Sequence, residues 1–142
     1  MSTVEDLRRI VGAPHVLDRA DDMAPFLVDW RKRYFGQAQA VVLPSSADQV
    51  AAVIAWCART GTPAVPQGGN TGLVGGATPA ADGRAIVVSL KRMRQIRAVD
   101  AANGTLTAEA GCTMVEVQDA ARASGQLFPL SLAAEGSATI GG

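Results

Sequence analysis

The sequence predicts an α+β fold in which short β-α-β pieces and a hairpin surround glycine-rich loops. From residue 40 onward, short apolar runs alternate with helical patterns that begin at capping residues and end at glycines. The pair Asn103-Gly104 separates two strand-like runs, which is the pattern of a hairpin. Glycine, proline and small polar residues gather in residues 66–76 and 127–142, and we expect loops there.

Residues 1–38 are predicted to form an N-terminal helical extension. Residues 3–11 read as a short helix with Thr3 as N-cap and Gly12 as the stop, and Leu7 and Val11 lie on its apolar face together with Val4. Residues 22–29 are predicted to form another helical turn, with Pro25 near its start.

Three of the six aromatic residues, Trp30, Tyr34 and Phe35, then flank the basic run 31–33. We interpret this stretch as an amphipathic segment that lays its rings on the main domain, with contact to a ligand as the alternative.

Residues 39–142 are predicted to form the main domain, and its first half is a β-α-β piece. Residues 40–43 make a short apolar strand, and the pair Ser46 and Gln49 forms a capping box. The helix that follows carries its apolar face up to the stop at Gly61, and residues 64–66 are the next strand. That face consists of Val50, Val53, Ile54 and Cys57.

The second half repeats the alternation. Residues 85–90, 96–100 and 105–110 are predicted strands, and the last two form the hairpin. Thr113 and Glu116 form a second capping box, which opens a helix that stops at Gly125. Residues 127–142 are expected to be loop, and the ending on an apolar residue and two glycines indicates a chain truncated at its C-terminus.

Composition indicates a small molecule as the partner. The 142 residues are 48% hydrophobic, enough for one compact domain, and 13 basic residues balance 13 acidic ones. Because the sequence has no long basic run, it does not predict a positively charged surface for nucleic acid or for an anionic membrane. No apolar stretch approaches the roughly 20 residues of a membrane span, and the acidic N-terminal residues favour a cytoplasmic protein.

The chain offers little for metal or redox chemistry. Cys57 and Cys112 lie on separate predicted elements without C-x-x-C spacing, so we expect both to be free, buried thiols. His15 is the single histidine and stands without nearby partner ligands. We therefore predict no metal site.

The stretch Pro66 to Gly76 is the strongest candidate for a binding site. It follows a strand, holds five glycines in eleven positions and carries no charged side chain. Such a loop can turn its backbone N–H groups toward an anion, so a diphosphate could approach closely, and Asn70 and Thr71 could add donors. A simple tight loop is the alternative. Neither a Walker loop nor a dinucleotide G-x-G-x-x-G motif is present, because no Gly-Lys-Ser/Thr end occurs and a strand, rather than a helix, follows.

The order of these motifs resembles the FAD-binding domain of the vanillyl-alcohol-oxidase/para-cresol-methylhydroxylase (PCMH-type) superfamily. The resemblance rests on the Val42-Leu43-Pro44 strand end, the Gly68-Gly69-Asn70-Thr71-Gly72 loop and the Glu109-Ala110-Gly111 strand end. It covers residues 40–142 and is strongest with the D-2-hydroxyglutarate and D-lactate dehydrogenase branch.

This resemblance implies FAD as the cofactor, bound along two loops. The implied cofactor-binding residues are Pro66, Gln67, Gly68, Gly69, Asn70, Thr71 and Gly72 in the first loop, and Pro129, Leu130, Gly136, Ser137, Thr139, Ile140, Gly141 and Gly142 in the second. Some members attach FAD through a histidine in the first loop. Because Asn70 stands there, non-covalent FAD is predicted. Valine at Gly69 is expected to abolish flavin binding through a clash with the pyrophosphate.

The resemblance also implies oxidation of a D-2-hydroxy acid by hydride transfer to flavin N5, with a later substrate domain absent from residues 39–142. No catalytic residue is assigned, because the two loops contain no histidine, lysine or arginine, and Glu135 is their only acid. Glu135 could act as a catalytic base, and the alternative is that it is an acid of the loop that faces solvent. A stand-alone, non-catalytic nucleotide- or anion-binding module and a structural piece remain the alternative functions, and the oligomeric state is open.

Overall fold

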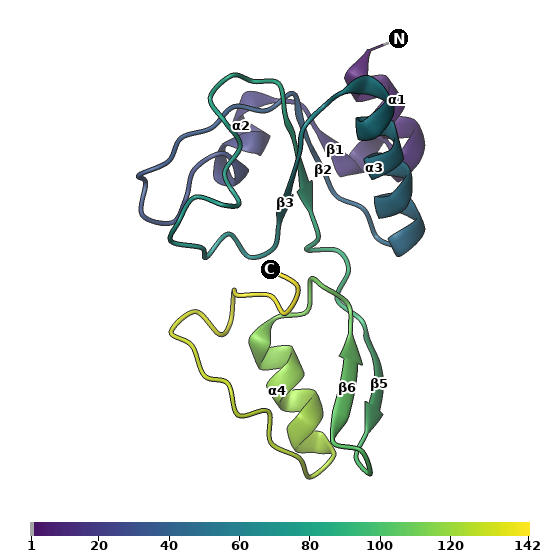
Figure 1. Ribbon diagram of the computed structural model, residues 1–142, viewed down its shortest axis with the longest axis vertical. Helices are drawn as coiled ribbons and strands as arrows, with labels where there is room; N and C mark the ends of the chain where they lie inside the picture. Colours follow the sequence, from purple (N-terminus) through teal and green to yellow (C-terminus); the bar gives the residue numbers. More distant parts are fainter. Residues whose placement is uncertain (1) are drawn as a thin grey trace.

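The protein has two parts joined by a short connection, seen in a computed structural model that describes residues 2–142. One part holds a four-stranded sheet with helices beside it, and the other holds a hairpin packed on one helix (Figure 1). The C-terminal stretch runs back from that helix and ends between the two parts (Figure 1). The predicted α+β fold is confirmed.

The four-stranded sheet has the order β1-β2-β4-β3. Its strands are β1 (Val16–Leu17), β2 (Ala40–Val42), β3 (Ala64–Gln67) and β4 (Ile86–Ser89). The strands β2, β4 and β3 run parallel, and β1 is antiparallel to β2. Strand β4 thus lies between the two strands of the predicted β-α-β piece. Pro66 is tolerated in β3 because this strand lies at the sheet edge.

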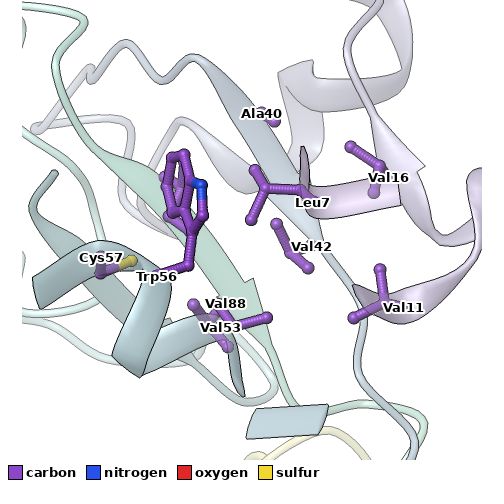
Figure 2. Packing of buried hydrophobic residues seen from close by; sticks show 10 residues of the cluster. Leu7, Val11, Val16, Ala40, Val42, Val53, Trp56, Cys57 and Val88 are labelled. Carbon is purple, nitrogen blue, oxygen red and sulfur yellow. The ribbon is translucent and has the colours of Figure 1, made fainter. Parts of the chain in front are cut away.

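Both faces of the sheet are covered, which explains why its strands are apolar throughout. Val42 and Val88 face α1 (Thr3–Val11) and α3 (Ala47–Thr60), where they pack with Trp56 (Figure 2). Their neighbours in the strands, Val41 and Val87, face the opposite way, toward α2 (Ala20–Met23) and the 3₁₀-helix η2 (Ala24–Phe26). The alternation follows from the period of two along a strand.

The N-terminal 38 residues belong to the same core. Leu7, Val11 and Val16 pack in the cluster that holds α3 and the sheet (Figure 2), with a further 3₁₀-helix, η1 (Ala13–His15), between α1 and β1. The boundary between residues 38 and 39 stays a prediction. Helix α1 has the predicted bounds and ends at Gly12, but its N-cap is Ser2 rather than Thr3, and that cap makes no side-chain hydrogen bond.

Helix α3 departs from the predicted capping box and apolar face. The Ser46 hydroxyl accepts the N–H of Gln49, but the Gln49 side-chain oxygen accepts the N–H of Ser45 (2.8 Å) instead of closing the box at Ser46. Ile54 is 46% exposed, whereas Trp56 is buried. The helix lies on the sheet along the line of Val53, Trp56 and Cys57, so Ile54 turns to solvent.

The second part consists of β5 (Ile96–Asp100), β6 (Thr105–Ala108) and α4 (Met114–Ala123). The predicted hairpin is confirmed: β5 and β6 pair antiparallel, and Gly104 takes the positive φ that the turn requires. Asn103 does not take a positive φ, and its side chain donates to the Asp100 carboxylate (2.6 Å). The capping box of Thr113 and Glu116 is complete, with both reciprocal bonds present.

The segment between α2 and β2 corrects two predictions. The helical structure predicted for residues 22–29 begins at Ala20 and ends at Phe26. The aromatic rings do not all lie on the main domain, since Trp30 and Phe35 are 71% and 67% exposed. The buried Asp29 carboxylate accepts the N–H groups of Arg33 and Tyr34 and curls the chain into a tight turn, which directs these rings outward.

Cys57 and Cys112 are buried, free thiols, as predicted. Within residues 2–142, no cluster of three or more His, Cys, Asp or Glu side chains is arranged to hold a metal ion. No helix in this described part of the chain is long and apolar enough to cross a membrane.

Candidate functional site

The first glycine loop starts where β3 ends. Strands β3 and β4 are parallel neighbours in register, with Gln67 opposite Ser89, so the chain leaving β4 at Lys91 emerges at the same edge of the sheet. Ligands of α/β proteins bind outside the carboxyl ends of such strands. The topology therefore places the loop at the edge where a binding site is expected.

Two amide side chains fix the shape of this loop. Gln67 is 1% exposed, and its Nε2 donates to the carbonyl oxygens of Phe26 (3.0 Å) and Ala77 (2.9 Å). Asn70 has φ 53°, a left-handed conformation that asparagine tolerates better than most residues, and its Nδ2 donates to the carbonyl oxygens of Val28 (2.9 Å) and Pro25 (3.3 Å). The N-terminal segment thus holds the loop, and these bonds use both N–H groups of the Asn70 side-chain amide.

The second loop packs directly on the first. A Cβ atom at Gly69 would overlap the carbonyl oxygen of Ser137, and one at Gly68 would overlap the Thr139 hydroxyl and the Gly142 backbone. Gly68 and Gly69 are therefore needed for contact between the loops. Gly72, Gly76 and Gly136 have no such neighbour within 4 Å, and neither does Gly142, so these glycines face open space.

Backbone hydrogen bonds tie the second loop to the start of α4. The N–H of Ile140 donates to the Cys112 carbonyl (2.8 Å), and the N–H of Gly141 donates to the Ala110 carbonyl (2.9 Å). The N–H of Met114, in the first turn of α4, donates to the Ala138 carbonyl (2.9 Å). The two loops therefore meet across the junction between the two parts of the protein.

A cleft of about 300 Å³ opens where the loops meet. Its lining residues are Pro25, Phe26, Gln67, Gly68, Gly69, Asn70, Lys91, Arg94, Gly111, Thr113, Gly136, Ser137 and Thr139. An adjoining cleft of about 370 Å³ is lined by Pro66, Gly69, Asn70, Thr71, Gly72, Val74, Gly76, Ala77, Ala138, Thr139 and Gly142. Loop residues from both predicted stretches are thus brought together.

Four residues predicted for the second loop lie elsewhere. Pro129 and Leu130 line a separate cleft on α4, and Ile140 lines an apolar cleft of about 220 Å³ beside the hairpin. Gly141 packs against Ala110, where a Cβ would overlap that residue. The apolar cleft is lined by Asp100 and by no basic side chain, whereas Lys91 and Arg94 line the junction cleft. We therefore favour the junction as the site for an anion.

Glu135 lines the same α4 cleft as Pro129 rather than the junction. Its Oε1 accepts the N–H of Leu132 (3.0 Å). Hydrogen bonds from Ser131 and Gln118, followed by that N–H, lower the pKa of Glu135. The carboxylate stabilises the turn at residues 131–135.

The sequence prediction missed six residues that line the junction cleft: Pro25, Phe26, Lys91, Arg94, Gly111 and Thr113. Lys91 could have been found from the rule that ligands bind at the carboxyl ends of parallel strands, because it lies two residues after the end of β4. Its Nζ lies 4.7 Å from the centroid of the Phe26 ring. Phe26 and Pro25 arrive from the N-terminal segment, which carried no such signal.

Arg94 is already paired. Its guanidinium donates to Glu116 through Nε (3.1 Å) and Nη2 (2.5 Å). This bond, together with N–H and hydroxyl bonds from Thr113, lowers the pKa of Glu116. The Glu116 carboxylate therefore both pairs with Arg94 and caps the N-terminus of α4.

The residues at the junction fit a diphosphate. The hydroxyl of Thr139 is buried and has no hydrogen-bond partner among residues 2–142, although an unpaired buried hydroxyl is costly. It lines both clefts, beside the open glycine faces. No acidic side chain lines the junction cleft within the described chain, whereas two basic ones do. A phosphate oxygen at this point would give the hydroxyl its partner.

The sequence pattern of the family described as "FAD binding domain" matches residues 38–142. The chain belongs to this FAD-binding family. The match includes both glycine loops, the three parallel strands and the two hairpin strands. The cofactor predicted from the sequence is therefore supported by the family as well as by the site.

Two curated relatives show the branch of the family. A D-2-hydroxyglutarate dehydrogenase of Xanthomonas citri pv. viticola is 38% identical over 96% of this chain and 28% of its own length. A mitochondrial D-2-hydroxyglutarate dehydrogenase of Arabidopsis thaliana is 33% identical over 98% of this chain and 24% of its own length. The chain thus spans about a quarter of the length of these relatives.

Solved structures show the same fold. An alkyldihydroxyacetonephosphate synthase superposes with a TM-score of 0.86 at 17% identity, over 97% of this chain and 27% of that protein. A p-cresol methylhydroxylase superposes with a TM-score of 0.78 at 24% identity, over 95% and 27% of the two chains. The predicted PCMH-type fold is confirmed.

Proposed function

We propose that this chain forms the FAD-binding part of an oxidoreductase that acts on a D-2-hydroxy acid, similar to 2-hydroxyglutarate or lactate. The observation that carries the proposal is the meeting of two glycine loops at the carboxyl edge of the sheet, in a cleft lined by the buried, unpaired hydroxyl of Thr139. The names of the curated relatives support the reaction class, since both are called D-2-hydroxyglutarate dehydrogenases.

In this proposal the residues divide into those that bind and those that position. The open faces at Gly72 and Gly136, with the Thr139 hydroxyl, hold the diphosphate. Gln67 and Asn70 hold the first loop in the binding conformation through their bonds to the N-terminal segment. Bound FAD supplies a hydride acceptor at flavin N5.

We propose that FAD binds without a covalent link. Asn70 stands where some similar proteins carry a histidine, and His15, the single histidine of the chain, lines neither cleft. Acid precipitation of the flavin-loaded protein is expected to leave the flavin in the supernatant. Flavin that stays with the precipitate and with the denatured polypeptide on a gel would contradict this.

The function is tested with the protein translated from its complete open reading frame. We expect it to carry flavin absorbance and to lose that absorbance under anaerobic conditions with D-2-hydroxyglutarate or D-lactate, while the L-enantiomers serve as matched controls. Flavin binding without bleaching by any 2-hydroxy acid would support a non-catalytic nucleotide-binding module instead. A purified, folded protein that does not bind FAD would refute both.

We also propose a cytoplasmic location for the protein. The Arabidopsis relative is described as mitochondrial. Cell fractionation with an antibody against the protein distinguishes the two: recovery with a membrane-bounded compartment would contradict the proposal.

A further inference from the structure

Lys91 is a cation at the junction cleft without an acidic partner. No ion pair joins it to a carboxylate in the described part of the chain, and its one recorded contact is the ring of Phe26 at 4.7 Å. It lies two residues after β4, and the N–H of the intervening Leu90 donates to the Gln67 carbonyl (3.0 Å), so the chain leading to Lys91 is held to the sheet. The side chain is exposed, which leaves its ammonium group able to reach a bound anion.

The other positive groups at this cleft are occupied. Arg94 is held by three hydrogen bonds to Glu116, and its charge is matched by that carboxylate. The N-terminus of α4 is capped by the same carboxylate, which accepts the Thr113 N–H (2.7 Å). A diphosphate in the cleft would therefore find neutral donors from the loops and one uncompensated charge, on Lys91.

We propose that Lys91 pairs with the diphosphate of FAD and supplies the charge that the glycine loops lack. The inference rests on the proposed function and deepens it, because it names a cation for the diphosphate, and the two glycine loops contain no basic residue. The two glycine loops present dipoles, and Thr139 presents a hydroxyl, but none of them carries a net positive charge. A dianionic diphosphate in a cleft without acidic lining residues attracts the nearest free ammonium group.

The test measures FAD affinity rather than turnover, with the protein from the complete reading frame stripped of flavin. Lys91→Met removes the charge and keeps an unbranched apolar stem that can lie on Phe26, and Lys91→Arg restores the charge. Arg97→Gln is the matched control, because Arg97 pairs with Glu109 on the hairpin (3.1 Å) and lines neither cleft. Flavin fluorescence gives the Kd at low and high ionic strength, and urea denaturation of the apo-protein reports the fold.

We expect Lys91→Met to weaken FAD binding about fivefold at low ionic strength, the size of an exposed ion pair, and the difference to shrink in high salt. Lys91→Arg should bind like the wild type, as should Arg97→Gln. An unchanged Kd in Lys91→Met overturns the inference while the proposed function stands, and so does a loss that is independent of salt. Failure of the wild-type protein to bind FAD refutes the proposed function itself, and the inference with it.

Discussion

Replacing Gly69 with alanine should destabilise the protein even without flavin, because the added methyl group falls on the backbone of the second loop. The ideal Cβ position overlaps the carbonyl oxygen of Ser137 and the carbon behind it. A backbone atom cannot rotate away as a flexible side chain can, so the two loops must move apart. This gives a different reason for the glycine from the sequence-based one, which was a clash with the pyrophosphate.

The expected cost is about 1–3 kcal/mol, as for other overpacked sites, which corresponds to a fall in Tm of roughly 2–12 °C for a domain of this size. Urea and thermal denaturation of the flavin-free protein measure it. Gly76→Ala is the matched control: it lies in the same loop, has no atom within 4 Å of the added carbon and does not have positive φ. That variant should stay within about 0.5 kcal/mol of the wild type.

Equal stability of the Gly69→Ala and Gly76→Ala apo-proteins would refute the loop contact. Gly72→Ala extends the test to the ligand, since its Cβ would meet no protein atom within 4 Å. We expect this variant to keep wild-type stability and to bind FAD more weakly, because the methyl group occupies a face that we assign to the diphosphate. Unchanged FAD affinity would remove Gly72 from the site.

Three further predictions concern the supports of the site. Gln67→Leu should destabilise the protein by about 1–3 kcal/mol, because the carbonyls of Phe26 and Ala77 lose their donor, as measured by urea denaturation. The Glu116 pKa is lowered, mainly by Arg94, so this carboxylate stabilises the fold above its ordinary pKa of 4.5, and the contribution is lost as pH falls toward the lowered value. The stability lost in Glu116→Gln should therefore shrink between neutral pH and pH about 3. Burial raises the pKa of Cys57 and Cys112, so both thiols should resist alkylation until the protein unfolds.

Each of these has a contradicting result. Gln118→Leu is the control for Gln67→Leu, since Gln118 is only half-buried and its hydrogen bonds go to the Leu130 carbonyl and the Glu135 carboxylate at the protein surface. Equal costs in the two variants would argue against the role of Gln67. For Glu116, a stability difference that does not depend on pH would mean that the carboxylate charge is not involved. For the cysteines, rapid labelling by iodoacetamide in native buffer would show that they are accessible.

Local signals in the sequence were sufficient for most elements. The capping residue Thr113, the stop at Gly61 and the Asn103-Gly104 turn each act within a few residues, so the helices and the hairpin could be predicted from them. The apolar strands were also visible, because a sheet covered on both faces leaves continuous apolar runs. The errors came from longer-range effects: Ile54 faces solvent and Trp30 lies outward because of how α3 packs and how Asp29 folds the chain.

The sequence by itself determined the family and the class of cofactor, and it predicted the two loops that we propose bind this cofactor. Glycine density after a strand is a local property, and the order of motifs is read along the chain. Only the tertiary structure decided which glycines serve contact between the loops and which face open space. It also decided that Gln67 and Asn70 bind the N-terminal segment and that Lys91 lines the junction cleft. These depend on pairs of residues far apart in sequence, which parallel strand order and hydrogen bonding bring to one edge of the sheet.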